Sequence, residues 1–487
     1  MARFWLICTL NYVTAVICGS AYEACKKAQE ALGDLVVDTA PLNQTLVDKH
    51  WSDTCDLEPY CIFTPTTSED VSDLIKIVAQ FQVKFAVRSG GHSPNPGWNG
   101  VDGRGVLFDL AGLNRLSVSV DGSVASFGPG ARWLDILAAT SAHNVSVLCP
   151  RTPDVGVGGF HLGGGVSFTA NQFGLAASRV RQFEVVLGNG SIVTASDDRN
   201  SDLFWALKGG GANFGIVTRF EVDTIPTNEM WYSLTIYPSG HAEEVLDAMA
   251  RWQLGGAHDL KASIQLVLGL DSIIVLLCYS EVASLPVSFK PFYELPDGQV
   301  VLPPTNSTFH SLMKMIGETF AAQPGRHDYR GVASAIDAQL YKDVYRFWEL
   351  RARSVRATTG ANQSFVIQHV SKNLAIQAQK EGVALWAYRP RTLNARWTTT
   401  VDWEAAKDDD AVRAVSIETT ALMKSLSMER NLEVPFLYMN DASRDQDPIA
   451  TYGSDNVNKL KRVSQDYDRG QVFQRLQNDG FLLRKLE

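Results

Sequence analysis

Two glycine-rich segments carry the side chains best suited to chemistry. The first reads Arg88-Ser89-Gly90-Gly91-His92-Ser93, and the second runs from Thr152 to Gly165. Because glycine lacks a β-carbon, successive glycines let backbone N–H groups approach a phosphate or a flat ring closely. The neutral imidazole of His92 is a competent nucleophile near neutral pH. The two segments together indicate a nucleotide-type site beside a nucleophilic histidine.

The second segment does not match the common nucleotide-binding fingerprints. Counting from Gly156 places His161 where the third glycine of the Rossmann fingerprint should stand, and there is no Walker lysine. Taken alone, the run from Gly156 to Gly165 would be interpreted as a structural turn. The interpretation therefore depends on the motifs that accompany it.

Five motifs in order resemble the FAD-binding domain of the vanillyl-alcohol oxidase and p-cresol methylhydroxylase (PCMH) flavoproteins. They are Pro65 with Glu69-Asp70-Val71, Arg88 to Ser93, Val155 to Gly159, Gly163 to Gly165, and Gly209 to Val217. The segment from Tyr438 to Phe473 is similar to the end of berberine-bridge-enzyme-like oxidases. The ending Asp479 to Leu483 is similar to their fungal branch, whose members often serve secondary metabolism.

The resemblance implies FAD bound covalently through His92. In this family a histidine at that position bonds the 8α-methyl group of the flavin. Many relatives add a cysteine three residues before Val155, where this chain has Thr152, so we expect a single attachment. Cys149 could serve only if the intervening loop were built differently. The other expected cofactor residues are Arg88, Ser89, Gly90, Gly91, Ser93, Pro153, Val155, Gly156, Gly158, Gly159, Gly163, Ile216, Val217 and Asn440.

The resemblance also implies roles for two residues in the reaction. Tyr438 matches a tyrosine that reaches over the flavin ring, where it could take a proton from the substrate as hydride leaves. A tyrosine that only fills the core is the competing interpretation. Val155 matches a position facing the flavin C4a region, where a small side chain leaves room for dioxygen, although a buried valine is also simply good packing. We therefore expect an oxidase.

A mixed α+β framework must position these loops. An apolar run, Ile62 to Pro65, leads into a helix capped by Ser68, and the strand Val83 to Val87 ends at the first glycine segment. Farther along, Trp231 to Tyr237 and a hairpin of Ile264 to Leu268 with Ser272 to Tyr279 indicate long antiparallel strands. We expect a PCMH-type two-part FAD-binding domain at 57–228, an antiparallel-sheet substrate domain with flanking helices at 229–427, and a C-terminal segment at 428–487 that returns to the FAD domain.

Aromatic residues of the expected substrate domain could contact the substrate, but core packing is the role that we expect for each. They are Trp231, Tyr237, Tyr279, Trp386 and Tyr388. Arg389 and Arg391 are left open between the pocket and the surface. The run Asp408 to Asp410 indicates a solvated helix start, because no complementary ligands stand nearby, and no metal is expected.

The composition and the first twenty residues agree with export of the protein from the cell. The chain has 487 residues and a net charge of -9, which argues against nucleic acid or an anionic membrane as a partner. Residues 1–20 predict a signal peptide whose apolar stretch is too short to span a bilayer. We expect one disulfide among Cys25, Cys55 and Cys61. Sequons begin at Asn43, Asn144, Asn189, Asn306 and Asn362 and fit a secreted glycoprotein, although Asn189 lies in a predicted hairpin turn.

The predicted function is that of a secreted FAD-dependent oxidoreductase. It would remove hydride from a small organic substrate, a secondary metabolite, and pass the electrons to dioxygen. One alternative is an oligosaccharide oxidase of the same superfamily, against which Thr152 counts because those relatives commonly carry two flavin attachments. A flavin-binding protein without turnover and a dehydrogenase that ignores oxygen are further alternatives. The oligomeric state is left open.

Overall fold

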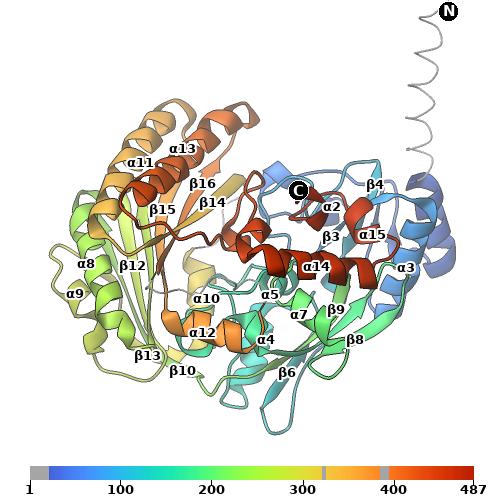
Figure 1. Ribbon diagram of the computed structural model, residues 1–487, viewed down its shortest axis with the longest axis horizontal. Coiled ribbons are helices and arrows are strands. Elements are labelled where there is room, and N and C mark those ends of the chain that lie inside the picture. Colours follow the sequence, from blue (N-terminus) through green and yellow to red (C-terminus); the bar gives the residue numbers. More distant parts are fainter. Residues whose placement is uncertain (1–20, 321–324, 384–393, 487) are drawn as a thin grey trace, which may run out of the picture.

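The computed structural model describes residues 21–320, 325–383 and 394–486 (Figure 1). Three β-sheets form its framework, two in the N-terminal half and one in the other half. This mixture of helices with largely antiparallel sheets is the α+β class that the sequence predicts. The expected signal peptide and the candidates Trp386, Tyr388, Arg389 and Arg391 lie outside the described residues.

The first sheet has four strands in the order β1-β2-β4-β3. The strands β2 (Cys61–Phe63), β4 (Gly105–Asp109) and β3 (Lys84–Arg88) pair in parallel, and β1 (Val37–Asp38) joins β2 antiparallel. Strand β1 precedes residue 57, where the sequence places the start of the FAD-binding domain. That boundary and those at 228 and 427 stay predictions.

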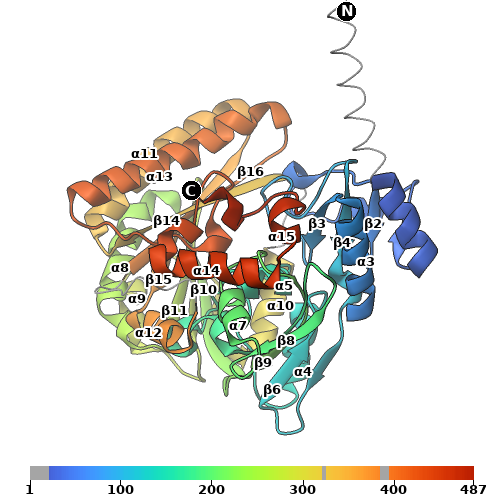
Figure 2. The same cartoon turned by 45° about the vertical axis from the view of Figure 1, so that its right-hand side comes forward.

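Helix α3 (Ser68–Phe81) connects β2 to β3 and packs beside the first sheet (Figure 2). Its predicted apolar residues Val71, Leu74, Ile75 and Val78 are fully buried. The predicted cap at Ser68 is wrong by one position. Thr67 is the N-cap, because its side chain accepts the N–H of Asp70 while the Asp70 carboxylate accepts the N–H of Thr67. This reciprocal capping box satisfies two backbone donors that the helix itself leaves free.

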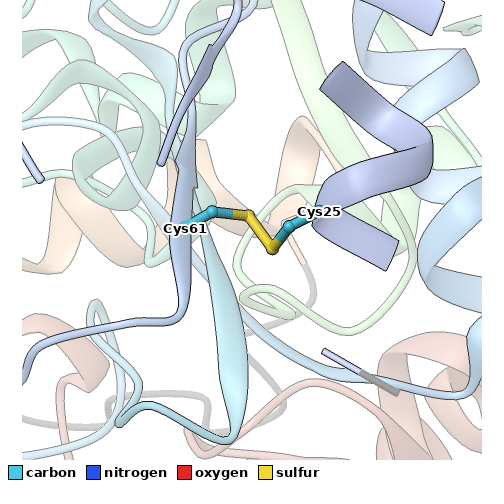
Figure 3. The surroundings of a disulfide bond; sticks show 2 residues. All are labelled: Cys25 and Cys61. Carbon is cyan, nitrogen blue, oxygen red and sulfur yellow. A yellow bond between two sulfur atoms is a disulfide. The ribbon is translucent and has the colours of Figure 1, made fainter. Parts of the chain in front are cut away.

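A disulfide ties the N-terminal helix to the first sheet. Cys25, on the helix of residues 21–32, bonds Cys61 at the start of β2 (Figure 3). The prediction of one disulfide among the three candidate cysteines is thereby confirmed. Cys55 is a buried thiol whose Sγ donates a hydrogen bond to the carbonyl oxygen of Ser93, at 3.1 Å.

The second sheet is antiparallel, with five strands in the order β5-β6-β9-β7-β8. Its strands are β5 (Leu116–Val118), β6 (Val124–Phe127), β7 (Val180–Val186), β8 (Ile192–Ser196) and β9 (Ile216–Asp223). Four helices accompany it, α4 (Trp133–Ser141), α5 (Val157–Leu162), α6 (Ala170–Phe173) and α7 (Ser201–Leu207). The turn between β7 and β8 is the predicted hairpin, in which the Asn189 side chain accepts the N–H of Ser191.

The third sheet is antiparallel, with seven strands in the order β13-β10-β12-β11-β15-β16-β14. The strands are β10 (Glu229–Pro238), β11 (Ala262–Gly269), β12 (Ser272–Tyr279), β13 (Gln299–Thr308), β14 (Arg326–Ala335), β15 (Asn362–Val370) and β16 (Asn394–Trp403). The predicted hairpin is β11 with β12, where Leu268 faces Ile273. Helices α8 (Ala242–Leu254), α9 (Lys290–Tyr293), α11 (Ala338–Thr359) and α13 (Asp409–Glu429) cover its outer face (Figure 1), whereas α10 (Phe309–Thr319) and α12 (Lys372–Lys380) contact the FAD half.

The acidic run that the sequence interprets as a helix start lies at the beginning of α13. Asp409 there pairs with Arg326, their Oδ2 and Nη2 atoms 2.6 Å apart. Among the residues that the structure describes, no group of histidines, cysteines and carboxylates could hold a metal ion. In the same described ranges, no helix is long and apolar enough to cross a membrane.

The C-terminal segment returns to the first half, as the resemblance implies. Helices α14 (Ser454–Tyr467) and α15 (Val472–Arg475) lie against that half in both views (Figures 1 and 2). The N–H of Phe85 donates to the carbonyl of Leu476 at 3.0 Å, and the N–H of Asn478 donates to the carbonyl of Phe85 at 2.7 Å. The end of the chain is therefore bonded to β3, the strand that leads to the first glycine segment.

A buried ion pair closes the carboxyl ends of β3 and β4. Nη2 of Arg88 lies 2.9 Å from Oδ2 of Asp109, and both side chains are fully buried. Nζ of Lys49 lies 3.3 Å from the same carboxylate oxygen. Burial raises the pKa of Asp109, but the positive charges of Arg88 and Lys49 outweigh burial and hold that pKa below its usual value.

Replacing Asp109 by Asn should lower the free energy of unfolding by about 3–5 kcal/mol, because it leaves buried cations without a counter-charge. The matched change Asp102→Asn, which breaks an exposed pair with Arg104, should leave stability nearly unchanged. Denaturant unfolding measures both. Since the folded pKa of Asp109 is lowered, its contribution is present at neutral pH and is lost as the pH falls through that pKa. Equal unfolding midpoints for Asp109→Asn and wild type at pH 7 would contradict this account.

Candidate active site

A large cavity lies between the two FAD-half sheets and the third sheet. Its volume is about 510 Å³. Its wall comes from the loop after β3, residues 150–163, the start of β9, strands of the third sheet and the C-terminal segment. Both glycine segments therefore meet at one site, together with residues from the far end of the sequence.

The two glycine segments cross at Gly90 and Gly156, where neither has room for a side chain. A β-carbon on Gly90 would lie 2.4 Å from the Cα of Gly156, and one on Gly156 would lie 2.3 Å from the N of Gly90. Ser89 fastens the crossing, because its Oγ donates to the carbonyl of Pro129 (2.6 Å) and accepts the N–H of Gly158 (3.0 Å). These glycines are thus required first to bring two loops into backbone contact.

Most residues predicted to contact the cofactor line the cavity. They are Ser89, Gly90, Gly91, His92, Ser93, Val155, Gly156, Gly158, Gly159, Gly163, Ile216, Val217 and Asn440. Arg88 and Pro153 do not line it. The guanidinium of Arg88 is held by Asp109, and Pro153 lies against Gly317 of α10. The predicted contacts of these two side chains with the cofactor find no support in this placement.

His92 is partly exposed on the cavity wall, in a stack of three rings. The ring of Trp51 lies between those of His92 and His327, with centroid distances of 4.3 and 4.5 Å. Nδ1 of His92 is 3.3 Å from Oδ2 of Asp154. Burial raises the pKa of Asp154, but the hydrogen bond and charge of His92 outweigh it and lower that pKa to about 2. An ionised carboxylate and an indole face therefore hold the imidazole.

The two candidate positions for a second attachment differ in their surroundings. Thr152 lines the cavity, whereas Cys149 does not. Cys149 is fully buried in the hydrophobic core, and burial raises the pKa of its thiol. A thiol kept protonated and away from the cavity is a poor nucleophile toward anything bound there.

Tyr438 lines the same cavity and is almost fully buried. Its Oη accepts a hydrogen bond from Nδ2 of Asn440 (3.1 Å), and the Arg396 guanidinium lies over its ring at 4.4 Å from the centroid. Burial raises the pKa of Tyr438 to about 12, although the charge of Arg396 acts in the opposite direction. Asn440 also bonds the Phe160 carbonyl (3.2 Å), which links the C-terminal segment to α5.

The third sheet supplies polar cavity residues that the sequence analysis missed. They are Gln265, Tyr329, Gln368, Arg396, Thr398 and Thr400, and outside the sheet Trp51, Arg151 and Asp441 were also missed. A signal was present for the residues on β15 and β16, because Gln368, Arg396 and Thr398 alternate there with buried Phe365, Ile367, Ala395 and Trp397. A strand with one apolar and one polar face has its polar face at solvent or at a site.

The aromatic candidates of the third sheet lie on the other face. Trp231 and Tyr237 are buried in the core between the sheet and its outer helices, and Tyr279 packs against that core. None of the three lines the cavity. Core packing, the role expected for each, is the role that the structure gives them.

Glycine loops that meet around a cavity, with a nucleophilic histidine on its wall, fit a dinucleotide with a flat ring. The fold and the site define a flavin-dependent oxidoreductase. In agreement, residues 59–196 match the family model described as "FAD binding domain".

Similarity to known proteins identifies the family of the chain. It is 36% identical over 444 residues to an FAD-dependent monooxygenase of Arthrobotrys oligospora, covering 90% of this chain and 84% of that protein. Its fold matches xylooligosaccharide oxidase of Myceliophthora thermophila (TM-score 0.78, 22% identity, 95% of this chain and 99% of that one). It also matches glucooligosaccharide oxidase of Acremonium strictum (TM-score 0.75, 21% identity, 87% and 92%), whose structure is described as carrying 6-S-cysteinyl, 8α-N1-histidyl FAD. The chain belongs to the FAD-dependent oxidoreductases of the vanillyl-alcohol oxidase and berberine-bridge-enzyme-like family.

The glycine crossing predicts different outcomes for two neighbouring substitutions. Gly156→Ala should lower the melting temperature by several degrees and prevent flavin loading, because its β-carbon would overlap the backbone of Gly90. Gly159→Ala should keep the fold, since a β-carbon there meets no atom within 4 Å. Thermal unfolding and the flavin-to-protein absorbance ratio measure both effects. A Gly156→Ala protein that loads flavin normally would refute the crossing as a requirement.

Proposed function

We propose that this protein is a secreted oxidase that carries FAD on a single covalent bond to His92 and oxidises a small organic substrate in the same cavity. The observation that carries the proposal is the shared wall: His92, the glycine crossing and Tyr438 all line one cavity. The covalent histidyl flavin described for the Acremonium oxidase supports the attachment. The core position of Cys149 supports a single bond.

Bound FAD would supply a hydride acceptor that dioxygen can reoxidise. The protein's part begins with holding the group: backbone N–H groups near Gly90, Gly91 and Gly156 can approach a pyrophosphate because no β-carbons intervene. The Asp154 carboxylate, which its lowered pKa keeps ionised, would orient the His92 ring for covalent attachment, while the face of Trp51 keeps that ring in place. Covalent attachment would retain the cofactor outside the cell.

Tyr438 would manage the substrate proton. With a pKa of about 12 it is mostly a neutral phenol at physiological pH, so it accepts the substrate proton in its minor phenolate form, which the nearby cation of Arg396 favours. The hydrogen bond from Asn440 fixes the phenol oxygen. A substrate O–H, N–H or acidic C–H placed against this oxygen loses its proton as the neighbouring C–H bond loses hydride.

Dioxygen would accept the two electrons and two protons and leave as hydrogen peroxide. Val155 lines the cavity, where its small side chain would leave room for dioxygen, and its carbonyl accepts the Trp133 indole N–H at 2.8 Å. The name of the Arthrobotrys relative gives a second candidate, monooxygenation, in which the two electrons and two protons taken from the substrate reduce one oxygen atom of dioxygen to water and the other oxygen atom enters the product. Peroxide yield separates the two, because an oxidase releases one peroxide for each substrate oxidised and a coupled monooxygenase releases none.

Export is supported by the disulfide and by the sequons. All five sequon asparagines, Asn43, Asn144, Asn189, Asn306 and Asn362, are exposed. Exposed acceptor asparagines are open to glycosylation in the secretory pathway.

Acid precipitation followed by peptide mass spectrometry should find FAD on the peptide that contains His92. His92→Ala should abolish the adduct and let all flavin wash away, whereas Cys149→Ser should keep the adduct, since that thiol lies in the core. An adduct that survives His92→Ala would refute the assigned atom. Protein that never binds flavin would refute the proposed function.

Tyr438→Phe should slow anaerobic flavin reduction about 10²–10⁴-fold, the usual contribution of a general base. Reduction is followed by stopped-flow absorbance with a substrate found by peroxide release from a panel of small alcohols, amines and oligosaccharides. Because the active form is the phenolate, the wild-type rate should rise with pH between 7 and 10, and the variant should lose this rise. Tyr345→Phe removes a hydroxyl from the outer core and serves as the control. An unchanged rate in Tyr438→Phe would remove Tyr438 as the base.

A further inference from the structure

We propose that Arg151 and Arg396 form the binding site for a negatively charged oxygen of the substrate, so that the substrate is an organic acid or an enolate-forming carbonyl compound. This inference rests on the proposed function and names its substrate class. Both arginines line the cavity, and they come from different parts of the fold, the segment before Thr152 and strand β16.

The two cations converge on one neutral oxygen. Nη1 of Arg151 and Nη2 of Arg396 both donate to Oε1 of Gln368, on strand β15. Nε of Arg151 is buried and has no hydrogen-bond partner among the described residues. Gln368 therefore satisfies one N–H donor of each guanidinium, and the buried Nε of Arg151 stays free for another acceptor.

The site holds more positive than negative charge. Asp441 is the one carboxylate paired with Arg396, its Oδ2 lying 2.9 Å from Nε, and it also accepts the Thr398 hydroxyl at 3.0 Å. Asp479, the other carboxylate in the cavity wall, is bound by Lys485. Two arginines against one available carboxylate leave about one uncompensated positive charge inside an acidic protein.

A bound anion would compensate the excess positive charge of this site. Burial, and then the charge of Arg396, lower the pKa of Arg151, which shows that its cation is disfavoured by its surroundings. Guanidinium groups bind carboxylates and similar oxygen anions through paired, directional hydrogen bonds, which a neutral ligand cannot match in charge. The ring of Phe168 is an apolar neighbour of this site, its centroid lying 5.8 Å from the guanidinium carbon of Arg151.

The site would orient the substrate against the proposed base. The Arg396 guanidinium that takes part in it also lies over the ring of Tyr438. An anion held by both arginines therefore places the adjoining part of the molecule beside the phenol oxygen. Arg151 and Arg396 are assigned to specificity and orientation, and the proton transfer stays with Tyr438.

The test uses benzoate and benzamide, which have nearly the same shape and differ in charge. Titration of the purified flavoprotein is followed by the flavin absorption spectrum and by the melting temperature, which rises when a ligand binds the folded state. Benzoate should bind about tenfold or more tightly than benzamide, because only benzoate pairs with the free guanidinium donors. Equal affinities for the two would overturn the inference.

Gln368→Glu is the sharpest variant, because it is isosteric and places a carboxylate where both guanidiniums already meet. It should weaken benzoate binding about tenfold without lowering the melting temperature. Gln379→Glu makes the same change at an exposed position on α12 and should leave binding unchanged. Unaltered benzoate affinity in Gln368→Glu would overturn the inference.

A second experiment tests whether the arginines bind a negatively charged flavin instead of a negatively charged substrate. Sulfite adds to oxidised flavins and leaves an anionic ring, so its affinity reports stabilisation of flavin charge. Arg151→Gln and Arg396→Gln should weaken benzoate binding and change sulfite affinity by less than about threefold. Variants that weaken sulfite and spare benzoate would assign the arginines to the flavin and overturn the inference. The melting temperature can be measured without flavin, so it tests benzoate binding even where the flavin assignment fails. Mass spectrometry of the His92 peptide tests the flavin assignment separately.

Discussion

The backbone contact between Gly90 and Gly156 is the constraint on which the rest of the site depends. It joins the end of β3 to the start of α5, and it works only because neither residue has a side chain. Behind it, the Arg88–Asp109 pair fixes the ends of β3 and β4, and the Ser89 hydroxyl fastens the second loop to the first. This part of the cavity wall is thus main chain that contacts within the protein hold in place, which leaves backbone donors available to a ligand.

The third sheet completes the site with side chains instead of backbone. Its strands place apolar residues against the outer helices and polar residues toward the cavity, which follows from the alternation of a pleated strand. Arg396, Thr398 and Gln368 lie on that inner face, within reach of Tyr438 and Asp441 from the C-terminal segment. One half therefore holds a common cofactor by its main chain, while the chemistry facing the substrate can vary at alternate positions of a sheet without disturbing the core.

The sequence predicts features that depend on neighbours along the chain and misses those that depend on contacts across the fold. The hairpin of β11 and β12, the apolar face of α3 and the glycine segments are local patterns, and the structure has them. Strand alternation reveals two faces without saying which one the helices cover, so the sequence alone leaves a pocket role open for Trp231 and Tyr237, which the structure places in the core. Arg88 sits inside a cofactor motif, yet its guanidinium serves an ion pair with a residue of another strand. Trp51 had no local signal, since its role depends on two histidines that are distant in sequence.

The relative position of the two halves is itself a condition for the proposed chemistry, because the histidine comes from one half and the substrate face from the other. Polar and aromatic contacts at its edge set that position. Trp51 stacks between His92 of one half and His327 of β14, and the Ser52 hydroxyl bonds both the N–H (2.7 Å) and the carbonyl (3.0 Å) of His327. Hydrogen bonds are directional and aromatic rings prefer a few stacking geometries, so such contacts specify one arrangement more strictly than apolar burial alone. The residue that would carry the flavin is thereby held by a strand of the sheet that would bind the substrate.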